Sequence, residues 1–130
     1  MFFKNTRKLS FALSAVTALA GASLAFAPPA LAVTTTPIAT IQGTNRIAPS
    51  LGTSYTTRGF VTAAYPTGGF NGFYIQTAGT GGVIDFATHK ASDGIFVYGS
   101  DSVKTVSVGD YVEVTGKVAE YNGLTQLTFP

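Results

Sequence analysis

The sequence predicts an all-β fold, a small five-stranded barrel, preceded by a signal peptide that is cleaved. The strongest observation is the segment 108–129, VGDYVEVTGKVAEYNGLTQLTF, in which two stretches of alternating residues meet at Asn122-Gly123. Asn-Gly favours the two-residue type I′ turn of a β-hairpin, because both central residues of that turn need φ > 0. Three earlier segments also have the composition of strands, and glycines interrupt the longest strands, as they do where a small sheet curls into a barrel.

The first 32 residues have the pattern of a secretory signal peptide. A basic start precedes an apolar stretch over residues 9–26, and the ALA sequence at 30–32 is an A-x-A cleavage site. The alternative is an uncleaved membrane anchor, since the apolar stretch approaches the roughly 17–25 residues of a membrane-spanning helix. Ser, Thr and Gly residues dilute this stretch, which favours cleavage. We expect a mature chain that begins near Val33 and is secreted to the extracellular space, with no membrane attachment after cleavage.

The mature chain is almost neutral. The whole sequence has a formal charge of +2, but three of its eight basic residues lie within the first eight positions. From residue 33 onward five basic residues stand against six acidic ones, which gives 5 − 6 = −1. Near-neutrality argues against a protein that holds nucleic acid mainly through charge. The chain has no cysteine, which excludes disulfides and thiolate metal sites.

Residues 33–53 are predicted to form a lead-in segment and loop before the barrel domain, 54–130. The Thr-rich stretch 33–39 is predicted to lack fixed structure until Ile38. The stretch 41–52, IQGTNRIAPSLG, contains two glycines and a proline, which predict a loop or a short edge strand.

Three strands are predicted between this segment and the hairpin. They span residues 54–65, 70–77 and 93–98. Gly59 is a predicted bend within the first strand, and residues 66–69 form a turn. A long Gly-rich loop over 78–92 carries the only histidine, His89, and the stretch 99–107 is long enough only for a helical turn.

The turn at Asn122-Gly123 sets the register of the hairpin, which places Tyr121 opposite Leu124 and Val118 opposite Leu127. The residues predicted on the buried face are Val112, Val114, Val118 and Leu127. Those predicted on the outward face are Glu113, Thr115 and Lys117. Gly116 is predicted to mark a bulge or a bend. Five strands, glycine bends and an insertion between the third and fourth strands indicate a small, partly open OB-like barrel.

Three segments carry a family resemblance: TTRGFVT (56–62), SDGIFVY (92–98) and VGDYVEVTGKVAEYNGLTQL (108–127). They are similar to the N-terminal OB-like domain of secreted bacterial nucleases, in which this domain precedes a catalytic domain of the endonuclease/exonuclease/phosphatase type. The resemblance covers about residues 38–129. It implies that the chain is an N-terminal fragment of a larger secreted nuclease, and that a divalent metal serves the downstream catalytic domain. It also implies that this barrel is an accessory domain.

No catalytic residue, metal site or cofactor is predicted within this chain. A metal-dependent phosphodiesterase needs several converging carboxylates, whereas the carboxylates here flank turns or lie on outward strand faces. His89 is predicted to be a solvated side chain, and no nucleophile motif accompanies it. Asp85, Asp93 and Asp101 could supply oxygen ligands to a structural calcium ion, but their spacing of eight residues matches no known calcium loop.

A nucleic-acid interface is predicted on the second and third strands, because OB barrels present this face to single strands. If Ile75, Ile95 and Val97 fill the core, the opposite side of these strands exposes aromatic rings. The predicted stacking residues are Tyr74, Phe96 and Tyr98, and the predicted phosphate partners are Arg58 and Lys117. The alternative is that the rings cover the barrel beneath the long loop or pack on the catalytic domain.

Two functions from different classes follow from these observations. The first is a non-catalytic accessory domain of a secreted nuclease that weakly binds or orients extracellular DNA, its partner being single-stranded or extracellular DNA. The alternative is a packing or assembly module that contacts its own catalytic domain or the cell envelope without binding nucleic acid. An independent enzyme is disfavoured, because the residues for a catalytic site are lacking.

Overall fold

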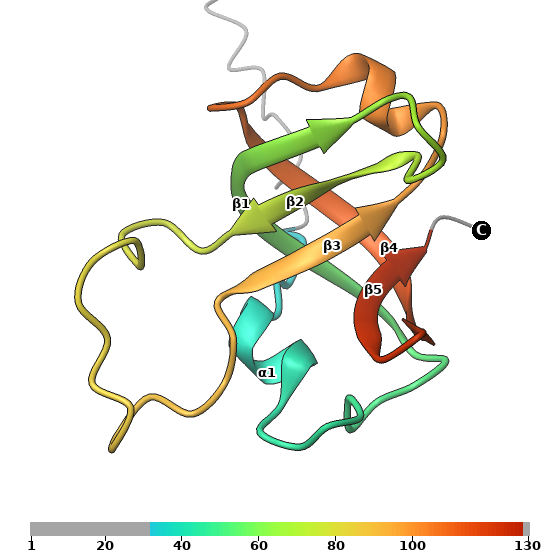
Figure 1. The fold of residues 1–130 in the computed structure, drawn as a ribbon. Helices are drawn as coiled ribbons and strands as arrows, with labels where there is room; N and C mark the ends of the chain where they lie inside the picture. Colours follow the sequence, from blue (N-terminus) through green and yellow to red (C-terminus); the bar gives the residue numbers. More distant parts are fainter. Residues whose placement is uncertain (1–31, 129–130) are drawn as a thin grey trace, which may run out of the picture. The chain divides into compact units, whose positions relative to one another are not determined.

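The computed structural model describes residues 32–128 and shows five strands closed into one barrel (Figure 1). The strands are β1 (Ser54–Tyr65), β2 (Gly72–Gln76), β3 (Gly94–Tyr98), β4 (Tyr111–Tyr121) and β5 (Leu124–Thr128). They follow one another around the barrel in the order β1-β2-β3-β5-β4, and each neighbouring pair is antiparallel except β3 and β5. The fold is therefore the predicted OB-like barrel. It is closed by the parallel β3–β5 pair, which corrects the expectation of a partly open barrel.

The long strand β1 serves two neighbours. It pairs with β4 from Ser54 to Phe60 and with β2 from Phe60 to Tyr65. Gly59 lies at this transition, where a Cβ atom would come within 2.7 Å of the carbonyl oxygen of Gln76. A register shift follows within the next few residues of β1. The glycine predicted as a bend thus lies where one strand changes partners.

The β4–β5 hairpin has the predicted turn and register. Asn122 and Gly123 have φ angles of 51° and 83°, and Tyr121 pairs with Leu124 as Val118 does with Leu127. The buried and exposed faces also follow the prediction, except that Val112 is only half-buried.

Gly116 does not form the predicted bulge, since it continues the regular pairing of β4 with β1. Its missing side chain instead leaves room for the core. A Cβ atom at this position would lie 3.0 Å from the Cβ of Leu127 and 3.1 Å from the carbonyl oxygen of Thr128.

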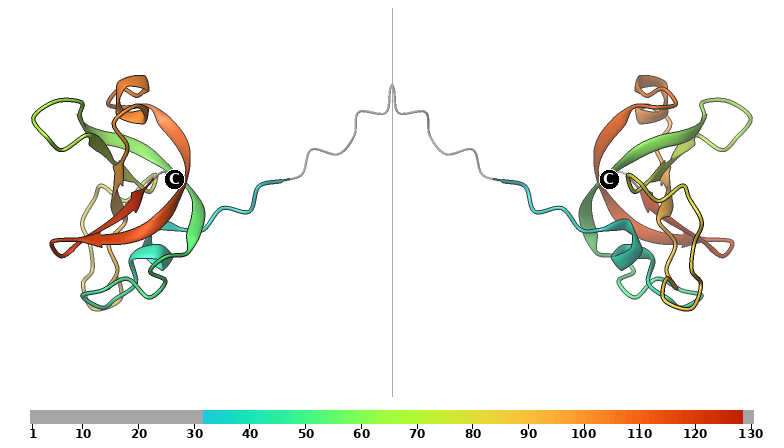
Figure 2. Two further views of the ribbon diagram at one scale, coloured as in Figure 1. Left: turned by 90° about the vertical axis from the view of Figure 1, so that its right-hand side faces the viewer. Right: turned by 90° about the vertical axis from the view of Figure 1, so that its left-hand side faces the viewer.

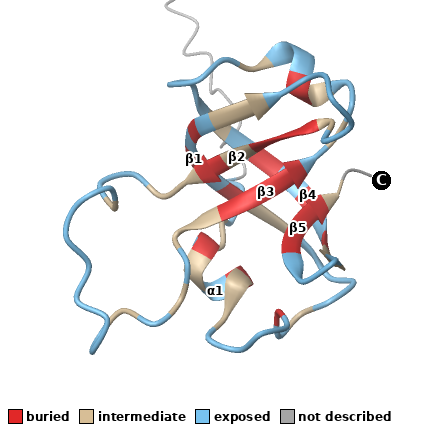
Figure 3. Cartoon of the chain, in the orientation of Figure 1, coloured by how far each residue is buried: buried red, intermediate tan, exposed pale blue. Residues whose placement is uncertain are grey.

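A short helix, α1 (Ile38–Gln42), closes one end of the barrel, where the sequence predicted unstructured chain and a loop. Ile38 and Ile41 are fully buried in the same cluster as the strand residues (Figure 3). Gln42 Nε2 donates a hydrogen bond of 2.6 Å to the carbonyl oxygen of Gly94 on β3. The helix has no side-chain cap, so burial of the two isoleucines rather than its local sequence stabilises it. A five-residue helix is too short to produce a periodic signal in the sequence.

The 3-10 helix η1 (Ser102–Thr105) lies at the opposite end of the barrel from α1 (Figures 1 and 2). It buries Val103 in the core and is the helical turn that the sequence predicted between 99 and 107. The strand pairings and the core cluster all lie between residues 38 and 128, so this segment has a core of its own. The predicted leader lies outside the described residues, except for Ala32. Within residues 32–128, no helix is long and apolar enough to cross a membrane.

Replacing Gly59 by alanine is expected to destabilise the protein by about 1–3 kcal/mol, because the added methyl group meets backbone rather than a movable side chain. Urea unfolding measures this change. Gly81→Ala is the matched control, since a Cβ atom there meets nothing within 4 Å and its change in stability should stay within about 0.5 kcal/mol. Equal stability of the two variants would contradict the role given to Gly59.

Candidate functional site

An apolar groove lies on the outer surface of the barrel, over β3 and β5. It is bounded by the β1–β2 loop and by the β4–β5 hairpin turn, and its volume is about 620 Å³. The residues that line it are Gly68, Gly69, Phe70, Phe96, Tyr98, Tyr121, Leu124, Gln126 and Thr128. None of these nine residues carries a charge. OB barrels bind their ligands at such a position, between these two loops.

Strand pairing places the predicted site residues in rows across this surface. Tyr98 on β3 pairs with Thr128 on β5, and Thr128 pairs with Lys117 on β4. Directly paired residues point to the same side of a sheet, so these three share the outer face. The next row along the strands contains Tyr74, Phe96 and Gln126. Four of the five predicted residues therefore lie in two adjacent rows.

Phe96 forms the floor of the groove and is not the exposed ring that was predicted. Only 4% of its surface is accessible. Its ring lies against Gly72 on β2, where any Cβ atom would collide with it, and the Tyr74 ring covers it at a centroid distance of 4.9 Å. The alternation of β3 places Phe96 on the outer face correctly. Its burial depends on a missing side chain in the neighbouring strand, which the alternation of β3 does not show.

Tyr98 is the accessible ring of the two rows, with 43% of its surface exposed. Tyr74 is half-buried, and its ring makes an edge contact with Tyr65 at 6.4 Å. Tyr65 in turn packs against Phe70 at 5.4 Å. A continuous run of rings therefore extends from the floor of the groove to the β1–β2 loop.

Sequence reasoning missed three residues of the groove walls, Phe70, Tyr121 and Leu124. All three are exposed large apolar side chains. They flank the two turns that the sequence did predict, at 66–69 and 122–123. Each of these residues alone gave no signal, because single exposed apolar residues are common, and only a contiguous exposed apolar patch marks a binding surface.

The two predicted phosphate partners lie in different places and differ in their ion pairing. Lys117 is exposed beside Thr128 at the margin of the groove and, within residues 32–128, has no ion-pair partner. Arg58 lies on the β1–β4 side of the barrel, where its Nε and Nη2 atoms each lie 2.7 Å from Glu113 Oε2. Glu113 precedes Lys117 by four residues of β4, which corresponds to about 13 Å. The structure thus separates Arg58 from the other four predicted residues.

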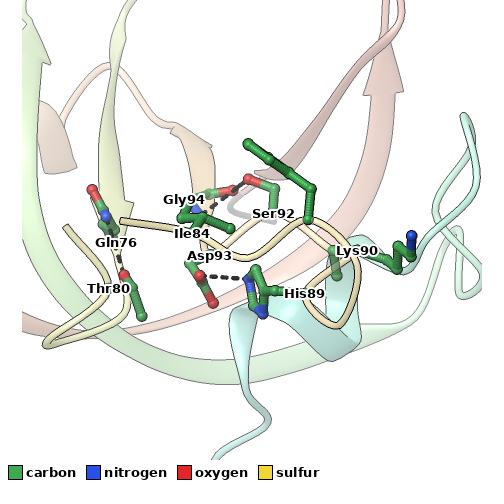
Figure 4. Close-up of a pocket in the computed structure, with 10 residues that line it drawn as sticks. Gln76, Thr80, Ile84, His89, Lys90, Ser92, Asp93 and Gly94 are labelled. Atoms are coloured by element: carbon green, nitrogen blue, oxygen red, sulfur yellow. Dashed lines mark hydrogen bonds and ion pairs between the residues drawn. The ribbon is translucent and has the colours of Figure 1, made fainter. Parts of the chain in front are cut away.

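A second hollow, of about 490 Å³, lies beneath the long loop between β2 and β3 (Figure 4). His89 Nε2 lies 2.7 Å from Asp93 Oδ2, without the alignment of a hydrogen bond, and 39% of the His89 side chain is exposed, so this histidine is partly solvated and also contacts a carboxylate. The Ser92 hydroxyl exchanges hydrogen bonds with the backbone of Gly94 instead of with His89. The pair therefore connects two parts of the loop and activates no described nucleophile.

The three carboxylates considered as calcium ligands have separate partners. Asp85 accepts hydrogen bonds from the backbone nitrogen of Ala87 and the hydroxyl of Thr88. Asp93 pairs with His89, and Asp101 lies 3.0 Å from Lys104. In the described part of the chain, no group of three or more His, Asp or Glu residues could hold a metal ion.

Comparison with protein-family models, with curated proteins and with solved structures finds no match to this chain. The geometry of the groove therefore carries the functional argument.

The different environments of Phe96 and Tyr98, which share one strand and one face, lead to a paired prediction. Phe96→Ala should cost about 3 kcal/mol of stability, because it leaves a cavity under Tyr74. Tyr98→Ala should cost about 1 kcal/mol or less, because much of this ring already faces water. Chemical unfolding of the two variants measures the difference. If both lost the same stability, Phe96 would not be the floor of the groove.

Proposed function

We propose that this barrel is a non-catalytic binding module that holds single-stranded DNA in the apolar groove. The observation that carries the proposal is the set of accessible aromatic rings, Phe70, Tyr98 and Tyr121, around one groove on the ligand-binding face of an OB-like barrel. Unpaired bases stack on such rings regardless of sequence, because every base has an aromatic face. A duplex keeps its bases stacked on one another and gains no such contact.

The arrangement of the rows supports a defined way of binding. A base lies against Tyr98, and the backbone passes over Thr128 toward Lys117, two strand spacings or about 10 Å away. The amide of Gln126 and the hydroxyl of Thr128 line the groove. The Thr128 hydroxyl donates its hydrogen to the carbonyl oxygen of Lys117, so it can accept, but not donate, a hydrogen bond at a base edge.

The proposed binding is weak. Phosphate neutralisation supplies most of the affinity of non-specific nucleic-acid binding, and Lys117 is the one described lysine or arginine that strand pairing brings to the margin of the groove. Stacking therefore provides most of the binding free energy. This agrees with the near-neutral charge of the sequence from residue 33 onward.

The resemblance of segments 56–62, 92–98 and 108–127 to the N-terminal domains of secreted nucleases supports a role for this binding. In such an arrangement the barrel orients an extracellular DNA strand, and a downstream metal-dependent domain hydrolyses it. The alternative is a packing module that covers the groove with its own catalytic domain or with the cell envelope. The absence of charge among the nine groove residues favours this alternative.

Binding of a fluorescently labelled single-stranded oligonucleotide to residues 33–130, followed by anisotropy at low salt, tests the proposal. Tyr98→Ala should weaken the affinity by about 5- to 150-fold, because stacking contributes about 1–3 kcal/mol per base. Tyr111→Ala is the matched control and should leave the affinity unchanged, since this exposed ring packs on Phe60 and does not line the groove. Absence of binding by the unaltered protein would overturn the proposal and leave the packing module.

The salt dependence of binding provides a second prediction. Lys117→Gln should reduce the slope of log affinity against log salt by about 0.7, the value for one phosphate contact on a single strand. Lys104→Gln is the control, because Lys104 lies on η1 and pairs with Asp101. An unchanged slope in the Lys117 variant would remove this residue from the interface.

A further inference from the structure

The chain contains two Asn-Gly dipeptides, Asn71-Gly72 and Asn122-Gly123. Asn-Gly is the dipeptide most open to attack by the backbone on the asparagine side chain, because glycine has no Cβ to hinder the approach. We propose that the fold makes Asn122 a site of spontaneous deamidation while it protects Asn71. The reaction places a new carboxylate at the rim of the groove.

The chemistry requires only water. The Gly123 backbone nitrogen gives up its proton to solvent base and bonds to Asn122 Cγ, and the bond from Cγ to the side-chain nitrogen breaks, so that ammonia leaves. The product is a five-membered succinimide ring. Water then opens the ring at one of its two carbonyl carbons, which gives aspartate or isoaspartate. An amide and water have become a carboxylate and ammonium, with no change in oxidation state.

The surroundings of Asn122 permit this reaction. Asn122 and Gly123 are both exposed at the tip of the hairpin, and the space beside the Gly123 Cα is empty to 4 Å. Within residues 32–128, the Asn122 side chain has no hydrogen-bond partner. The Gly123 nitrogen must turn toward Asn122 Cγ before it can react. Beyond the turn, this rotation disturbs the outermost strand pair, Tyr121 and Leu124, and both of these residues are exposed. Such tips open far more often than the body of a sheet.

The surroundings of Asn71 prevent it. Gly72 is buried within β2, where it pairs with Tyr65 on one side and with Tyr98 on the other. The carbonyl oxygen of Asn71 accepts a 2.9 Å hydrogen bond from the backbone nitrogen of Gly99. The nucleophilic nitrogen of Gly72 therefore cannot turn toward the Asn71 side chain unless the start of β2, where Gly72 lies, separates from Tyr65 and Tyr98.

Deamidation alters the rim of the groove, because Tyr121 and Leu124, on either side of the new carboxylate, both line the groove. It changes both the length of the backbone and the charge at this rim. Isoaspartate also adds one carbon to the backbone, which the two-residue type I′ turn has no room for. A negative charge at this rim repels an anionic strand. This consequence for binding rests on the proposed function, whereas the deamidation itself does not.

Peptide mapping by mass spectrometry of the chain of residues 33–130, aged at mildly alkaline pH, tests the proposal. In the folded protein, the peptide with Asn122 should gain the mass difference between an amide and an acid at least about tenfold faster than the peptide with Asn71, since the hairpin tip opens more easily than the paired and buried start of β2. In urea the two rates should become similar. Similar rates in the folded protein, or conversion of Asn122 only in urea, would refute protection by the fold.

The effect on binding is tested separately with preformed variants in the oligonucleotide assay. Asn122→Asp should bind more weakly than Asn122→Gly, which keeps the positive φ and carries no reactive amide. Equal affinity of these two variants would overturn the effect on the groove. If the unaltered protein bound no oligonucleotide, the proposed function would fail, while the mapping result would still decide the deamidation.

Discussion

The barrel depends on the bend at Gly59, where β1 leaves β4 and continues beside β2. A ring of only five strands needs strongly tilted and bent strands to close, and a backbone carbonyl already occupies the space in which a side chain would lie. On its other side β2 pairs with β3, and the parallel β3–β5 pair completes the ring. Closure in turn creates two open ends. Ile38 and Ile41 of α1 fill one end, and Val103 of η1 fills the other.

A second missing side chain shapes the outer surface. Because Gly72 has no Cβ, the Phe96 ring sinks against β2 and becomes the floor of a groove instead of a protruding ring. Tyr98, two residues further along the same strand, pairs with Gly72 itself, but the Phe96 ring already fills the space there, and Tyr98 remains accessible. The two turns on either side then supply the walls. The groove is therefore a consequence of barrel closure, and aromatic rings dominate it because β3 and its neighbouring turns are rich in them.

Several charged side chains of the described residues contact other parts of the protein. Arg58 pairs with Glu113 across β1 and β4, His89 pairs with Asp93 at the base of the long loop, and the Glu120 carboxylate joins the backbone of the lead-in segment to the hairpin. The groove itself is left without charge on its walls, and Lys117 stands at its margin. The aromatic, uncharged lining is suited to contact with flat apolar faces rather than to charge recognition.

The sequence alone predicts features that depend on residues close together along the chain. The Asn122-Gly123 turn, the register of its hairpin and the bounds of β1 belong to this group, because turn chemistry and side-chain alternation are local. Two isoleucines within five residues gave no comparable signal for α1, whose stability comes from burial. The depth of Phe96, the separation of Arg58 from Lys117 and the meeting of Phe70 with Tyr121 were decided by the tertiary structure. Each depends on which strands become neighbours when the barrel closes, and that pairing involves residues far apart in the sequence.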